Sequence, residues 1–304
     1  MKATVAICTW NRADLLEKTL AQMQRLNVPD GIQWELLVVN NNCTDNTDEI
    51  LNRYSTSLPL RRLLEPNAGL SNARNCAIRA AQGELLLWTD DDVLVDPDWL
   101  QRYILAFSEF PKATFGGGTI APWFSISPPK WAESNLDLLQ GAFAIRQLGT
   151  QLRILDETES VFGANMAFRT SALREIQFDP NLGVVGGQRI CGEEVEVINR
   201  LRKSGGVGLW VGNAKVKHFI PRERISAAYI RKVAVGYGKA IAHQSPDSSV
   251  ASLFGRPRWA LKKYVQHRAI ELACRPFRNR RWLRSLQEAG ICSGIIDYHC
   301  RQNA

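Results

Sequence analysis

Three consecutive carboxylates are the residues of this sequence whose types and spacing point most directly to chemistry. Asp90, Asp91 and Asp92 follow an apolar segment, 84–89. Like charges this close raise one another's pKa, and a bound divalent cation relieves the repulsion. Mg²⁺ and Mn²⁺ take oxygen ligands, and Mg²⁺ commonly combines one or two carboxylates with substrate phosphates. The triplet therefore predicts a metal-assisted phosphate site, and a solvated acidic turn before the next helix is the alternative.

Polar residues follow three earlier apolar segments in the same way. The segments 5–8, 35–39 and 60–64 are followed by Thr9 to Arg12, Asn40 to Asn42 and Pro66 to Gly69. Helices are expected after Arg12, with Asn11 as N-cap, from about residue 45 or 47, and over 71–81. Alternating strands and helices predict a mainly parallel α/β sheet. Such sheets bind ligands at the carboxyl ends of their strands, where all these polar residues would lie.

The second half of the chain has a less regular pattern. Loops are expected at 116–118, 122–131 and 183–192, which are rich in Gly, Pro or Trp. A helix is expected over 193–203, and strands near 208–211 and 215–217. After Pro221 the pattern becomes helical and basic, so the division predicted is 1–220 and 221–304.

Bulk composition indicates a folded protein without an anchor. The 304 residues are 45% hydrophobic and 22% charged, and no apolar run approaches the roughly 18 residues of a spanning helix. Cytoplasmic residence is the expectation. Seven cysteines without a Cys-x-x-Cys pair do not suggest a disulfide framework or a zinc site, and the neighbours His299 and Cys300 are too few for a metal site.

The net charge of +8 is concentrated near the C-terminus, where Glu271 is the single acid between Arg256 and Arg284. Within 259–274 an apolar stripe is expected opposite basic residues, made of Leu261, Tyr264, Val265, Ala269 and Leu272. Such a helix could lie on an anionic membrane surface or pack on the rest of the protein with its basic face in solvent.

Five blocks of sequence, in this order, resemble the family 2 glycosyltransferases over almost the whole chain. They are Thr9-Trp10-Asn11-Arg12, Val38 to Thr47, Asn67 through Gly83 into Asp90-Asp91-Asp92, Phe162 to Arg169, and Gly192-Glu193-Glu194 with Val216-Lys217-His218 downstream. The resemblance implies a GT-A fold, in which a mainly parallel Rossmann-like sheet is flanked by helices and carries a C-terminal helical extension. Within 1–220 it implies a nucleotide-sugar half, 1–115, and an acceptor half, 116–220.

The resemblance also implies roles for individual residues. Those expected at the nucleotide-sugar donor are Thr9, Trp10, Asn11, Arg12, Asn40, Asn41, Asn42, Asn67, Gly69, Arg74, Asp90 and Asp91. Asp90, Asp92 and His218 are expected at a divalent metal, Mn²⁺ or Mg²⁺, although which two aspartates contact it stays open. Gly163, Asn165 and Met166 are expected beside the acceptor. Many relatives have aspartates in place of Asn40 and Asn41, which leaves the nucleotide base open.

A general base is required because the acceptor hydroxyl loses its proton as it attacks the sugar. Glu194 shares a helix face with Ile198 and Leu201, whereas Glu196 is placed to pair with Arg200. Relatives usually have Glu-Asp here with the aspartate as base, which implies that role for Glu194, with Glu193 as the alternative. An inverting mechanism follows.

The predicted function is transfer of a sugar from a nucleoside-diphosphate sugar, UDP-sugar favoured, to a saccharide or lipid-linked saccharide. A nucleotidyltransferase should carry a Gly-rich phosphate loop where this chain has Thr9 to Arg12. A nucleic-acid binder would leave the acidic triplet unexplained, so no nucleic acid is expected. A dinucleotide-dependent oxidoreductase should show Gly-x-Gly-x-x-Gly after the first strand, which is absent from the sequence.

Overall fold

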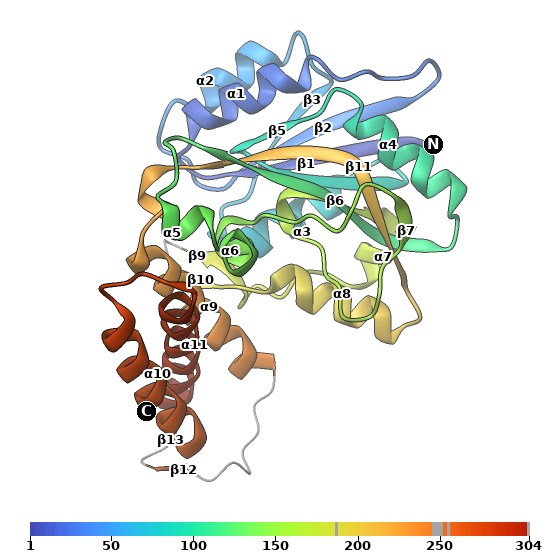
Figure 1. Ribbon diagram of the computed structural model, residues 1–304. Coiled ribbons are helices and arrows are strands. Elements are labelled where there is room, and N and C mark those ends of the chain that lie inside the picture. Colours follow the sequence, from blue (N-terminus) through green and yellow to red (C-terminus); the bar gives the residue numbers. More distant parts are fainter. Residues whose placement is uncertain (186–187, 245–251, 254–255, 303–304) are drawn as a thin grey trace. The chain divides into compact units, whose positions relative to one another are not determined.

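The computed structural model describes residues 1–185, 188–244, 252–253 and 256–302 (Figure 1). The chain forms two compact units. The first comprises 1–123, 144–181 and 193–219, and the second comprises 124–143, 182–192 and 220–304. Each unit is built from segments that are far apart in the sequence.

A mixed sheet organises the first unit. Its order is β3 (Leu60–Leu64), β2 (Gln33–Asn40), β1 (Lys2–Thr9), β4 (Leu85–Asp90), β8 (Met166–Arg169), β6 (Ala113–Phe124), β11 (Val207–Ile220) and β5 (Val93–Val95), and β7 (Leu152–Ile154) also pairs with β11. The strands from β3 to β4 are parallel, whereas β8 runs antiparallel to both β4 and β6. The carboxyl ends of β1, β2, β3 and β4 therefore meet at one edge, as predicted.

Helices cover both faces of this sheet because successive strand residues point to opposite sides. Val5 and Ile7 of β1 pack with α1 (Ala13–Met23), α2 (Thr47–Tyr54) and α4 (Trp99–Glu109). Ala6 packs on the other face with α3 (Leu70–Ala80), α7 (Thr170–Glu175) and α8 (Glu193–Lys203). A short 3₁₀ turn, η1 (Gly163–Asn165), precedes β8. Thus α3 and α8, which carry candidate site residues, share one face (Figure 1).

Two of the expected loops are strands. Residues 116–118 lie inside β6, where the glycines allow close packing rather than a turn: a Cβ on Gly117 would lie 2.3 Å from Val161 Cγ1, and one on Gly118 would lie 2.2 Å from the carbonyl oxygen of Ala214. The region 183–192 contains β9 (Gly183–Val185) and β10 (Gln188–Ile190), and its residues 186–187 lie outside the described part. In the region 122–131, β6 continues to Phe124 and α5 begins at Lys130.

The second unit is mainly helical. Its elements are α5 (Lys130–Glu133), α6 (Leu136–Phe143), η2 (Arg222–Arg224), α9 (Ala227–Gln244), β12 (Ser252–Leu253), β13 (Arg256–Pro257), α10 (Arg258–Cys274) and α11 (Arg280–Gln302), together with β9 and β10. Helices α9 and α11 approach closely through glycines. A Cβ on Gly238 would lie 2.0 Å from the carbonyl oxygen of Ile291, and one on Gly294 would lie 2.1 Å from that of Val235.

This division differs from the predicted one, because segments expected in the acceptor half belong to the helical unit. Asp137 of α6 forms an ion pair with Arg280, and Gln287 donates to the carbonyl oxygen of Leu138 at 2.8 Å.

The apolar stripe predicted on α10 does not lie on one side of the helix. Leu261 and Tyr264 pack inward, whereas Val265, Ala269 and Leu272 are exposed. In the part of the chain that the structure describes, no helix is long and apolar enough to span a membrane.

Candidate active site

Side-chain amides connect the polar loops at the edge of the sheet. Asn41, which is buried, donates to the carbonyl oxygens of Glu65 and Asn67, both at 2.8 Å, and accepts the backbone N–H of Gly69 at 2.8 Å. The loop after β2 is therefore fixed to the loop between β3 and α3. Asn42, whose φ of 65° is left-handed, adds a hydrogen bond to the carbonyl oxygen of Pro66.

The loop after β1 is held in a similar way. Asn11 has a φ of 51° and accepts the backbone N–H of Thr44 at 2.7 Å. The prediction that Asn11 caps α1 is wrong, because Asp45 accepts the N–H of Ala13 at 3.0 Å and so caps that helix instead. Trp10 extends from the same loop with 48% of its surface exposed, so its indole is accessible to a flat ligand such as a nucleobase.

Asn40, predicted at the donor, is also engaged within the protein. Its amide donates to Asp48 and its carbonyl oxygen accepts the N–H of Cys43, both at 2.8 Å. Asn40 at the end of β2 and the two asparagines after it therefore shape the loops, and their side chains are hydrogen-bonded to protein partners.

The aspartates of the triplet have different surroundings. Asp91 is buried and accepts hydrogen bonds from Thr9 and Arg12, each at 2.9 Å. Burial raises the pKa of Asp91 to about 6, although Arg12 opposes that shift. Thr19 of α1 donates to the carbonyl oxygens of Asp91 and Val93. Asp91 is therefore an internal anchor of the sheet edge, and Asp90 and Asp92 remain as the candidates for a metal.

Asp92 and His218 are brought together by the pairing of β5 with β11. The His218 Nε2 lies 3.5 Å from an Asp92 carboxylate oxygen, and Arg12 lies 3.1 Å from the other oxygen. Burial raises the pKa of Asp90, and the nearby Asp92 raises it further. Arg12, Asp92 and His218, which belong to three separate blocks of the sequence, thus lie close together at the edge of the sheet.

This donor set fits a divalent cation that is completed by phosphate oxygens. Among the described residues no three His, Cys, Asp or Glu side chains already form a metal cluster. Carboxylate and imidazole are nevertheless suitable ligands for Mn²⁺, and such ions often use few protein ligands beside a nucleotide. Arg12, whose side chain is 40% exposed, occupies one Asp92 oxygen and would have to share it.

A buried ion pair links α3 to the start of α8. Arg74 Nη1 lies 3.0 Å from Glu193 Oε1, and the two side chains are 3% and 10% exposed. The guanidinium also lies over the rings of Trp88 and Phe178. The resemblance implied that Arg74 lies at the nucleotide-sugar donor. In the structure its guanidinium is buried and has Glu193 as its partner.

Two of the three residues expected beside the acceptor are buried. Asn165 is fully buried: its oxygen accepts from Trp99 and Tyr103, each at 2.8 Å, and its amide donates to two backbone carbonyls. Met166 is fully buried in β8. Their place beside an acceptor stays a prediction. Gly163 lies beside the ion pair, since a Cβ there would be 2.2 Å from Arg74 Nη2.

Glu194 differs from both neighbouring glutamates. Glu193 pairs with Arg74, and Glu196 pairs with Arg200 at 2.6 Å, as predicted. Glu194 is partly buried, and its surroundings raise its pKa to about 8, first through burial and then through the charge of Glu193. A carboxylate with a pKa near neutrality can accept a proton at the pH where it works. Of the two candidate bases, Glu194 has this property and Glu193 is held by a cation.

Sequence reasoning missed the residues that support the site. The sequence analysis assigned no role in the site to Asp45, Thr19 or Phe178, because each acts through a contact between segments distant in the chain. No local sequence pattern indicates that a helix is capped from another loop, or that an aromatic ring lies over a buried cation.

The chain matches known proteins in sequence. Residues 4–177 match the model of the family described as Glycosyl transferase family 2. A glucosyl-dolichyl phosphate glucuronosyltransferase of Haloferax volcanii is 24% identical over 255 residues, which are 79% of this chain and 77% of that protein. The succinoglycan biosynthesis protein ExoM of Rhizobium meliloti is 24% identical over 306 residues, 96% of this chain and 92% of that one.

Solved structures show the same fold. A mannosyltransferase of Pyrobaculum calidifontis in complex with GDP-Man and Mn²⁺ has a TM-score of 0.60 at 17% identity, covering 96% of this chain and 86% of that one. TarS of S. aureus in complex with UDP has a TM-score of 0.57 at 17% identity, covering 100% and 92%. The predicted GT-A fold is confirmed by these likenesses.

Removing the partner of Arg74 should be costly. Glu193→Gln removes the ion-pair partner of a buried guanidinium, and we expect a loss of about 3 to 5 kcal/mol in the free energy of unfolding, measured with urea. Arg74→Met combined with Glu193→Gln should cost less than the two single changes added together. Glu196→Gln is the control, because its pair is more exposed and should be worth below about 1 kcal/mol. Additive effects at Arg74 and Glu193 would contradict the coupling.

Glu194 should make stability depend on pH. Its pKa in the folded protein, about 8, lies above the ordinary value of 4.5, so the folded state binds more protons between those values. Its contribution to stability is therefore present at low pH and is lost as pH rises through 8. Glu194→Gln, measured in chelator, should gain stability relative to the parent from about pH 5 to pH 8.

The exposed variant Glu157→Gln is the control for that measurement. A difference between parent and Glu194→Gln that stays constant over this pH range would show that Glu194 titrates normally.

Proposed function

The chain belongs to glycosyl transferase family 2, and we propose that it transfers a sugar from a UDP-sugar to an acceptor hydroxyl with inversion at the anomeric carbon. The observation that carries this proposal is the convergence of Asp90, Asp92, His218 and Glu194 at one sheet edge. The acceptor proposed is a saccharide or a lipid-linked saccharide, in keeping with relatives named for succinoglycan biosynthesis and for a dolichyl phosphate substrate.

The nucleotide is proposed to bind across the loops after β1, β2 and β3. The exposed indole of Trp10 would stack on the base, and the rigid loop from Asn67 to Gly69 would approach the ribose. The backbone N–H groups at the start of α3 favour an anion, which suits the diphosphate. We propose UDP rather than GDP as the nucleotide. Solved structures of the same fold contain UDP in one case and GDP-Man in another.

Asp90, Asp92 and His218 would hold a divalent cation, which supplies charge stabilisation for the diphosphate as it leaves. Arg12, paired with Asp91 and Asp92, would neutralise the remaining carboxylate charge at this edge. Arg74 is proposed to act indirectly, because its pair with Glu193 fixes the first turn of α8 and with it the position of Glu194.

In the transfer step Glu194 accepts the proton of the acceptor hydroxyl. The hydroxyl oxygen forms a bond to the anomeric carbon, and the bond between that carbon and the diphosphate oxygen breaks, releasing UDP. The carboxylate of Glu193 would keep the neighbouring Glu194 basic, since like charges raise the pKa of a carboxyl group.

Nucleotide binding tests the donor half of this proposal. Calorimetry with UDP, GDP and ADP, with Mn²⁺ and with chelator, should give the tightest binding for UDP and at least about a tenfold loss in chelator. Asp92→Asn should lose most of the metal dependence, whereas Asp14→Asn, at an exposed position of α1, is a control on the same unit. Failure of every nucleoside diphosphate to bind would overturn the function proposed.

Replacing the base tests the catalytic half. Glu194→Gln should leave UDP affinity within about twofold and lower turnover of the donor sugar by about 10² to 10⁴. Glu196→Gln, one turn away, is the matched control and should retain turnover. Full turnover in Glu194→Gln would move the base to Glu193 or refute the mechanism.

A further inference from the structure

Helix α10 in the second unit presents apolar and cationic side chains together to solvent. Arg258, Lys262, Val265, Ala269 and Leu272 follow one another at steps of three or four residues and are all exposed. Residues with this spacing lie on one side of a helix. The stripe is therefore cationic in its first half and apolar in its second.

Large apolar groups extend this surface at both ends. Trp259 is 44% exposed and Phe277, just beyond the helix, is 75% exposed, while Val265 and Leu272 are 65% and 53% exposed. Lys263 lies over the Trp259 ring at 5.7 Å. We call the surface formed by Arg258, Trp259, Lys262, Lys263, Val265, Leu272 and Phe277 the basic-aromatic face.

Among the residues that the structure describes, Arg258, Lys262 and Lys263 of this face form no salt bridge. Glu271, the single acid between Arg256 and Arg284 in the sequence, is buried and pairs with Arg231 and Arg268. Its carboxylate is thereby directed to the inner side of α10. The outer cations face solvent together with the exposed apolar side chains.

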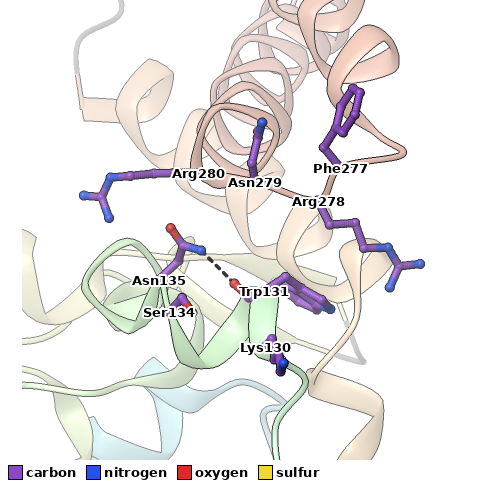
Figure 2. Close-up of a pocket in the computed structure, with 8 residues that line it drawn as sticks. All are labelled: Lys130, Trp131, Ser134, Asn135, Phe277, Arg278, Asn279 and Arg280. Atoms are coloured by element: carbon purple, nitrogen blue, oxygen red, sulfur yellow. Dashed lines mark hydrogen bonds between the residues drawn. The ribbon is translucent and has the colours of Figure 1, made fainter.

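Contacts within the unit hold the turn that carries Phe277. Trp131 of α5 and Trp282 of α11 pack edge to face with ring centroids 5.5 Å apart, and Arg280 pairs with Asp137. Beside Phe277 is a cavity of about 460 Å³ whose lining includes Lys130 and Arg278. Figure 2 shows Phe277 pointing away from Lys130 and Trp131. The turn therefore presents an outward ring next to a cation-lined hollow.

We propose that the basic-aromatic face binds the surface of an anionic lipid bilayer. Cations are attracted to anionic head groups, and Trp and Phe side chains insert at the boundary between head groups and acyl chains. A nucleic acid would match the cations but would leave the aliphatic side chains of Val265 and Leu272 in water. This binding would be independent of the sugar-transfer chemistry, and its test does not use turnover.

The experiment is co-sedimentation of the full chain with phosphatidylcholine vesicles, with and without about one-third phosphatidylglycerol. Binding is expected to the anionic vesicles, and it should weaken in high salt. Lys262→Gln with Lys263→Gln should reduce partitioning by about twenty-five-fold, since each cation near an anionic surface contributes about fivefold. Lys18→Gln with Lys112→Gln removes the same charge from exposed positions of the first unit and should have little effect.

Val265→Ser with Phe277→Ser tests the apolar part and should also weaken binding, with no change in melting temperature because both side chains are exposed. Two results of these assays would overturn the proposal: no binding to anionic vesicles, or an equal loss in the Lys18 and Lys112 control. Tighter binding to a single-stranded oligonucleotide than to anionic vesicles would assign the face to nucleic acid and would overturn it too. A dimer in solution that the serine variant dissociates would also overturn it, by assigning the face to contact between copies.

Discussion

The crowding of negative charge at one edge of the sheet is the constraint on which the rest of the first unit depends. Asp90, Asp91 and Asp92 leave β4 together, and α8 brings Glu193 and Glu194 within electrostatic range. In the unliganded protein Arg12 and Arg74 offset part of this charge. Each arginine is fixed on an acid that is not the proposed base, so Glu194 keeps a raised pKa and Asp90 stays partly exposed.

In this arrangement, the residues that hold the loops in place differ from those that are accessible to a ligand. The asparagine amides, Asp45 and Asp91 hold the loops through bonds to backbone and side-chain groups. Exposed groups at the same edge, such as Trp10, are accessible to a ligand. The first unit thus provides a scaffold in which buried polar groups are hydrogen-bonded to one another.

The sequence predicted the local elements well and the long-range contacts poorly. Strands β1 to β4 and helix α8 were recognised because apolar periodicity and polar strand ends are local signals. A loop was expected at Gly116 to Gly118 because the sequence does not distinguish a glycine required for close packing from one required for a turn. Asn165 was placed at the acceptor by its block, but its burial depends on Trp99 and Tyr103, which no spacing rule connects to it.

The pair between Arg74 and Glu193 also has a consequence for how the chain is made. The two residues are separated by 119 positions, so Arg74 leaves the ribosome well before its counter-charge. At about 5 to 20 residues per second the interval is on the order of ten seconds. Burying an unpaired guanidinium is strongly unfavourable, so the nascent first unit cannot complete its packing around α3 until α8 has been synthesised.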